Sequence, residues 1–381
     1  MIERFLSVLN KPFYWLDTHL YHIGYNPKKN NNYGPDAAFG IVLYVSLFIL
    51  SLLICVVWSW LDRKRPSYNR LNYWFRVYLR YAVAIIMLSY GMQKLIPIQM
   101  PYPDAVTLSG RFGDQSYFDV LWNFIGASPG YEIFTGMCEI TGSLLLLFRR
   151  SYVFGSLFMC TILTNIVALN IFYNVSVKTF SSFLLVCILY LLAPFFQKFI
   201  KLFFYQQEVT FAESHYHFQS KKIKYILNIS MALLIAAFLI RSISRNLKYY
   251  NKELAARRKT YEVTSFVTKD SLPANITDTL NWKKLALYSY DTTKHAVVYY
   301  NNEEVGDEYY YEMDSALKTF TIRNVSGKVI HHYVFNYDPI EKNNLNLTGK
   351  FKDYDVKINM KPIMVDSMML KKEKIKLVQD Y

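Results

Sequence analysis

The stretch AAFGIVLYVSLFILSLLICVVWSW, residues 37–60, decides the fold class, because it runs without a single charged side chain. About 20 consecutive apolar residues in a helix are enough to cross the ~30 Å hydrocarbon core of a bilayer. The chain is therefore predicted to be an integral membrane protein, with this stretch, extended to residue 61, as its first span.

Further apolar stretches follow at intervals and predict an α-helical polytopic bundle over residues 37–243. The six predicted spans are 37–61, 78–98, 131–148, 152–173, 180–196 and 225–240. Residues 1–36 carry apolar side chains at near-helical spacing and predict an amphipathic segment. Two placements stay open for this segment: on the membrane surface, or packed on the bundle.

The charge distribution points to lipid as the main partner. The chain has a net charge of +14, and its first 250 residues hold 23 Lys and Arg against 11 Asp and Glu. Basic loops between apolar spans are typical of the positive-inside rule, so anionic headgroups are expected partners and nucleic acid is not. The first, third and fifth loops are the basic ones, which places them in the cytoplasm and predicts that the N-terminus and the C-terminal tail both lie on the outer side of the membrane. The basic run over residues 241–259 disagrees with this orientation.

The C-terminal tail has a different sequence pattern. After a predicted helical linker at 244–260, residues 261–381 alternate apolar and polar side chains and predict a soluble β-rich domain. Its expected strands are 261–267, 284–290, 295–300, 308–312, 318–323, 328–335, 345–349 and 355–360. Short strands at this spacing predict an antiparallel sandwich or a small barrel.

The residues that bind metals are poorly placed. All four cysteines lie in apolar segments without Cys-x-x-Cys spacing, and the predicted spans contain no histidine. A haem or copper centre in the membrane needs such ligands, so no metal site is predicted.

Charged residues inside spans are the strongest functional signal, because one charge at mid-bilayer costs at least about 2.5–3.5 kcal/mol. Arg80, Lys94 and Glu139 are such residues. Side chains tilt toward the N-terminus of their own helix, so Lys94 and Glu139, on oppositely directed spans, are expected to converge. Arg80 lies about four helical turns before Lys94 on the same face, which predicts a polar seam of all three residues. The seam either fixes helix register as an ion pair or handles protons or a ligand.

Small and polar residues accompany the seam. Gly91, Gly136 and Gly142 are predicted to allow close helix packing. Asn165, in the fourth span, either forms interhelical hydrogen bonds or contacts a ligand along the seam.

These residues together resemble a known family. Arg80 near the start of a span, Gly91 and Lys94 at its far end, and Glu139-Ile-Thr-Gly142 before a basic pair are similar to the DoxX-like membrane proteins. The resemblance covers about residues 76–196 and implies a four-helix bundle made of spans two to five. It marks Arg80, Gly91, Lys94, Glu139 and Gly142 as the family-like set. The longer layout, with added spans and a soluble domain, looks like the form found in Bacteroidota, which implies a multi-pass protein of the bacterial inner membrane with a periplasmic tail.

Three functions stay open. The resemblance implies an accessory subunit of a redox or quinone-linked membrane system, with quinone as the implied cofactor and a redox complex as the partner. The size of the tail suggests a non-catalytic anchor or scaffold whose β-domain binds an envelope protein or ligand. Six spans with charges at mid-depth would also suit a small transporter.

Overall fold

The structure is a computed structural model in which residues 10–27, 34–108, 110–210, 221–255, 259–269, 281–290, 293–300, 307–324, 332–338, 344–352 and 354–364 are described. The chain divides into two compact units. One unit consists of Met1–Gln99, Tyr117–Leu121 and Gly130–Ser244, and is helical; the other consists of Met100–Ser116, Trp122–Pro129 and Arg245–Tyr381, and holds the strands.

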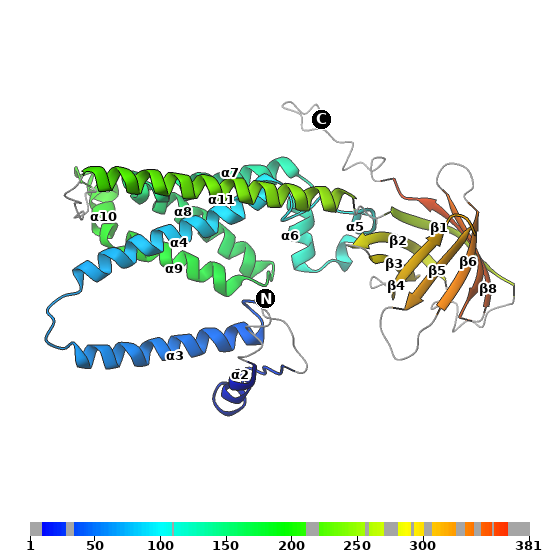
Figure 1. Ribbon diagram of the computed structural model, residues 1–381, viewed down its shortest axis with the longest axis horizontal. Helices are drawn as coiled ribbons and strands as arrows, with labels where there is room; N and C mark the ends of the chain where they lie inside the picture. The colour runs from blue at the N-terminus through cyan, green and yellow to red at the C-terminus, as the bar shows by residue number, and fades with distance from the viewer. Residues whose placement is uncertain are drawn as a thin grey trace. The chain divides into compact units, whose positions relative to one another are not determined.

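Helices occupy most of the first 255 residues (Figure 1). They are α2 (Asn10–Leu16), the π-helical turn η1 (Asp17–Tyr21), α3 (Ala38–Leu61), α4 (Asn69–Leu95), α5 (Ala105–Leu108), η2 (Phe112–Asp114), α6 (Tyr117–Gly126), α7 (Pro129–Leu147), α8 (Tyr152–Phe172), α9 (Lys178–Leu192), η3 (Ala193–Phe195), α10 (Phe196–Tyr205) and α11 (Lys221–Ala255). Helix α11 continues through most of the predicted linker at 244–260.

Four of these helices, α4, α7, α8 and α9, contact one another in a ring. Glycines let α4 approach α7 and α7 approach α8. Helices α8 and α9 share an extensive contact, and α9 returns to α4 through Arg76 and the Leu191 carbonyl oxygen. All four helices contribute to one apolar core, which consists of Val83, Ala84, Met87, Leu146, Leu147, Met159, Leu163, Leu184, Cys187, Ile188 and Leu191.

Three helical stretches in the described part of the chain are long and apolar enough to cross a membrane: Ala38–Leu61, Tyr152–Phe172 and Lys178–Tyr205. Helices α4 and α7 carry buried charged residues, which lower their hydropathy. The predicted sixth span at 225–240 lies within α11, where many side chains fall outside the described residues. Insertion into a membrane is thus supported by three helices, and the count of six spans stays a prediction.

The N-terminal helix packs against the start of α3. Phe13 and Tyr25 bury their rings against Phe39, at centroid distances of 5.4 and 5.6 Å. Tyr14 and Trp15, in contrast, are exposed. Residues 1–9 and 28–33 of the predicted amphipathic segment lie outside the described residues.

Asp36 joins the beginnings of α3 and α9. Its carboxylate accepts hydrogen bonds from the backbone N–H groups of Lys178 (2.7 Å) and Thr179 (2.9 Å), and from the Thr179 hydroxyl. The first N–H groups of a helix have no partner within it, and an aspartate commonly satisfies them. Asp36 therefore caps a helix that begins 142 residues later in the chain.

The strands of the second unit form a closed antiparallel barrel in sequence order (Figure 1). They are β1 (Lys259–Thr268), β2 (Trp282–Tyr290), β3 (Thr293–Tyr300), β4 (Asp307–Asp314), β5 (Thr319–Asn324), β6 (His332–Asp338), β7 (Leu345–Phe351) and β8 (Tyr354–Pro362). Pairing of β1 with β8 closes the barrel. The prediction of an antiparallel β-rich domain is confirmed, and of the two open alternatives the barrel is the correct one. Residues 325–331, which include the start of the predicted sixth strand, lie outside the described residues.

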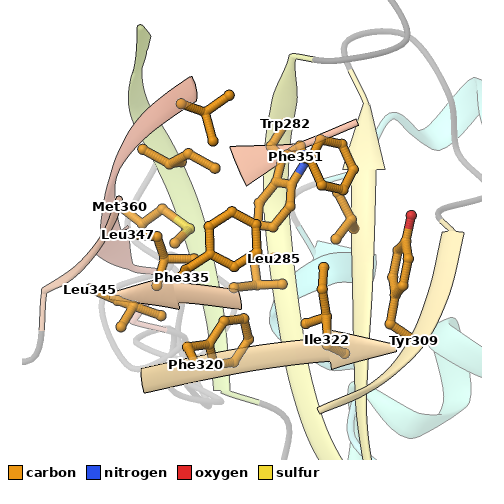
Figure 2. Packing of buried hydrophobic residues seen from close by; sticks show 14 of the residues in the cluster. Trp282, Leu285, Tyr309, Phe320, Ile322, Phe335, Leu345, Leu347, Phe351 and Met360 are labelled. Carbon is orange, nitrogen blue, oxygen red and sulfur yellow. The ribbon is translucent and has the colours of Figure 1, made fainter. Parts of the chain in front are cut away.

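Large side chains fill the barrel (Figure 2). Trp282 packs edge-on against Phe351 and Phe335, with ring centroids 5.2 and 5.7 Å apart. Phe320 and Ile322 add fully buried side chains from β5. An eight-stranded barrel is just wide enough for side chains to fill its interior. The interior is thus a packed core.

Candidate functional site

Lys94 on α4 and Glu139 on α7 form a buried ion pair. The Lys94 Nζ contacts the Glu139 Oε1, and the two residues are 8% and 1% exposed. The convergence expected from the tilt of side chains on opposed helices is confirmed. The other carboxylate oxygen, Oε2, is buried and accepts no hydrogen bond from the described residues.

Two glycines bring these helices close enough for the pair to form. A Cβ atom built on Gly91 would lie 2.9 Å from the Gly136 carbonyl oxygen, and one on Gly136 would lie 2.8 Å from the Lys94 Cβ. Such distances are shorter than a normal contact, so the backbones of α4 and α7 touch at this level. Gly142 faces α8, where a Cβ would lie 2.8 Å from the Met159 methyl group, which is the end of a flexible side chain.

Arg80 belongs to a different level of α4. It precedes Lys94 by 14 residues, or about 21 Å at the helical rise of ~1.5 Å per residue. Val83, Ala84 and Met87 lie between them, each at most 2% exposed, within the apolar core. The predicted seam is therefore two separate polar sites, the Lys94–Glu139 pair and the surroundings of Arg80.

Arg80 is 6% exposed and lies among aromatic rings. Its guanidinium carbon is 4.8 Å from the centre of the Tyr81 ring and 5.3 Å from that of Tyr152. Arg76, one turn earlier, donates a hydrogen bond of 2.8 Å to the Leu191 carbonyl oxygen. Two arginines of α4 thus lie at the contact with α8 and α9.

Asn165 does not join either site. It is exposed on α8, whereas Asn170 in the same helix is buried and donates a hydrogen bond of 2.9 Å to the Ser181 hydroxyl. The interhelical hydrogen bond that the sequence suggests for this helix is thus made by Asn170.

Two buried charged residues of the four-helix ring were not predicted from the sequence. Glu132 on α7 is fully buried, and Arg76 on α4 is 9% exposed. A signal for each is present in the spacing: Glu132 precedes Glu139 by seven residues and Arg76 precedes Arg80 by four, which places each on the same helical face as its partner.

The geometry of the pair limits its chemistry. A carboxylate that uses one oxygen for Lys94 retains lone pairs on the other oxygen, which can accept a hydrogen bond from a ligand. Burial of both residues excludes bulk water and strengthens the electrostatic interaction between them. The pair thus offers the kinds of donor and acceptor that a polar headgroup or a proton relay would need.

Comparison with known proteins gives one informative relative. No family model matches the chain, and no solved structure matches it. The chain is 30% identical over 131 residues to the uncharacterized protein YwoB of Bacillus subtilis (strain 168), a match that covers 34% of this chain and 79% of that protein. The chain therefore belongs to the same family as YwoB.

Proposed function

We propose that this protein is the membrane subunit of a redox or quinone-linked system, in which the Lys94–Glu139 pair binds a quinone headgroup or relays its protons. The barrel would lie in the periplasm and the helices in the inner membrane. One observation carries the proposal: a buried ion pair whose Glu139 Oε2 accepts no hydrogen bond within the described residues. A quinone carbonyl would accept from Lys94, and a quinol hydroxyl would donate to Glu139.

The resemblance to DoxX-like proteins supports the same function. Gly91, Lys94, Glu139 and Gly142 of that motif meet at the contacts of α7 with α4 and α8. Arg80, the remaining member, lies at the separate level described above, so the proposal rests on the ion pair alone.

The test is retention of quinone by protein purified in mild detergent from its native membranes. Wild-type protein is expected to retain quinone, and Glu139→Gln to retain about tenfold less, equal to ~1.4 kcal/mol. Membrane redox activity should fall in parallel. Glu208→Gln is the matched control, since Glu208 is an exposed carboxylate that follows α10. Wild-type protein without quinone, together with normal redox activity of Glu139→Gln membranes, would refute the proposal.

A second candidate function is a membrane anchor whose barrel binds an envelope partner. The filled interior of the barrel favours it, because a packed core leaves the outer surface for recognition. Here removal of residues 260–381 should abolish function while Glu139→Gln should not. The opposite pattern contradicts the anchor and supports the quinone-linked subunit.

Orientation has its own test. If the predicted topology is right, a reporter that works only in the periplasm should be active when it is fused after Tyr381. Activity of a reporter that works only in the cytoplasm, fused at the same position, would show that the tail lies in the cytoplasm.

A further inference from the structure

Arg80 is a buried cation without a counter-charge in the described part of the chain. It is 94% buried, donates no hydrogen bond and forms no ion pair there, and its Nε has no hydrogen-bond partner. Its contacts are the faces of Tyr81 and Tyr152.

Burying the charged Arg80 side chain without a counter-charge costs free energy. Arginine stays protonated in proteins, so Arg80 cannot lower the cost of burial by losing its charge. An ion removed from water loses solvation energy that a cation–π contact restores only in part. Arg80 and its surroundings therefore have the features of an anion-binding site, and a bound anion would offset the cost of burying the charge.

Arg80 lines a small cavity together with other residues that carry hydrogen-bond donors. Arg76, Arg80, Tyr73 and Tyr152 line it together with Val77 and Leu191, and its volume is about 10 Å³. A volume of ~10–15 Å³ holds one water-sized group, such as a single oxygen atom of a larger anion. Outside it, the Arg149 guanidinium donates a hydrogen bond of 3.4 Å to the Tyr73 hydroxyl. Three arginines and two tyrosines thus converge on this end of α4.

We infer that this cluster binds the phosphate group of an anionic ligand, with one phosphate oxygen reaching Arg80. Planar guanidinium groups suit phosphate because they donate paired hydrogen bonds to its oxygens. A phospholipid is the favoured source, because the site lies on the side of the bundle where the loop holding Arg149 and Arg150 places further positive charge. A soluble phosphate ester has the same chemistry and is the alternative source. This inference is independent of the quinone proposal, which concerns residues about 21 Å away along α4.

The experiment measures thermal unfolding of the full-length, delipidated protein in detergent. The probes are phosphatidylglycerol, zwitterionic phosphatidylcholine and glycerol phosphate. A ligand that binds the folded state raises the unfolding temperature by mass action. We expect phosphatidylglycerol to do so and phosphatidylcholine to do much less. Native mass spectrometry should show the same order of retained lipid, with about tenfold preference for phosphatidylglycerol.

Variants assign the effect to the cluster. Arg80→Gln should abolish the shift, whereas Arg150→Gln, which removes an exposed arginine of the α7–α8 loop, should preserve it. Arg80→Lys keeps the charge without the paired donors, and should fold and bind several-fold more weakly.

The outcomes separate the sources of phosphate. A shift with phosphatidylglycerol alone supports a lipid site, and an equal shift with glycerol phosphate supports a soluble phosphate ester. Equal shifts with both lipids, no shift with any probe, or an unchanged shift in Arg80→Gln would overturn the inference.

Discussion

Gly136 on α7 and Gly91 on α4 touch backbone to backbone, so that a Cβ on Gly136 would lie 2.8 Å from the Gly91 carbonyl oxygen. Their contact lies within one helical turn of both members of the ion pair. The distance between the two helices, and with it the geometry of the pair, is therefore set by the absence of two side chains.

Gly136→Ala should separate these helices. The new methyl group would meet backbone atoms that cannot move without shifting α4, and overpacking of this kind costs about 1–3 kcal/mol. Thermal unfolding of the detergent-purified protein measures the loss. Gly130→Ala on the same helix is the control, because a Cβ there has no neighbour within 4 Å. A variant at Gly136 as stable as this control would show that the close contact is not needed.

The ion pair should be strongly coupled. Removing either partner, by Lys94→Met or Glu139→Leu, leaves a buried charge alone and should cost about 3–5 kcal/mol. The double variant replaces the pair by apolar side chains and should cost less than either single change. A double-mutant cycle on the free energy of unfolding measures this, and strict additivity would mean that the two side chains do not interact.

This pair could be predicted from the sequence, and the break in the seam could not. Spacing along a helix tells which residues share a face, and the tilt of side chains tells which way they lean. Neither tells which helices pack against the apolar residues of α4 that lie between Arg80 and Lys94. Tyr152 and Leu191, which surround the arginine cluster, come from helices that are remote in sequence.

The barrel illustrates the same limit. Alternation of apolar and polar residues located the strands, because a sheet with one face on a core follows a period of two. Closure depends on the pairing of β1 with β8, about 100 residues apart. Local patterns hold no information on such a long-range register, and the sequence therefore left sandwich and barrel open.

Asp36→Ala should loosen the start of α9. Loss of a capping side chain costs about 0.5–2 kcal/mol, and Asp36 also ties α9 to α3. Burial raises the pKa of the Asp36 carboxyl, but hydrogen bonds from Thr179 and Lys178 outweigh burial and hold its pKa below the usual value. Its stabilisation should therefore be complete above the unfolded pKa of ~4 and be lost as pH falls below it.

Unfolding measured from pH 6 down to pH 2 checks this expectation. Asp114→Ala is the control, since Asp114 is exposed and its side chain forms no hydrogen bond or ion pair with the described part of the chain. Identical acid profiles for wild type and Asp36→Ala would contradict a capping role.

Neighbouring residues of β6 should differ sharply in their effect on the barrel. Phe335 is fully buried against Trp282 and Phe351, while Val334 is 46% exposed. Phe335→Ala should cost about 3–5 kcal/mol, and Val334→Ala well under 1 kcal/mol. Limited proteolysis of the full-length protein reports barrel unfolding. Equal protease sensitivity of the two variants would contradict the inward orientation of Phe335.

High pH should unfold the barrel through two tyrosines. Tyr300 and Tyr309, each 4% exposed, donate hydrogen bonds to the same Asp307 Oδ2, at 3.0 and 3.3 Å. Burial is the main cause that raises the pKa of both hydroxyls, since a tyrosinate would lose its hydration and face the Asp307 carboxylate. Both therefore stay protonated in the folded barrel at a pH where the unfolded chain releases their protons. Barrel stability should thus be full below pH ~10 and fall above it by about 1.4 kcal/mol per pH unit for each tyrosine.

The double variant Tyr300→Phe/Tyr309→Phe should flatten this decline, because phenylalanine has no proton to release. Denaturant unfolding at pH 9, 10 and 11 measures how steeply the stability of the barrel falls with pH. The near-ultraviolet signal of Trp282 follows unfolding, in a chain whose other tryptophans are replaced by phenylalanine. Tyr310→Phe, on the more exposed outer face of β4, should leave the slope as in the parent chain. A double variant with the parent slope would mean that the alkaline transition begins elsewhere. The shared Asp307 bond would then stabilise the barrel without governing its response to pH.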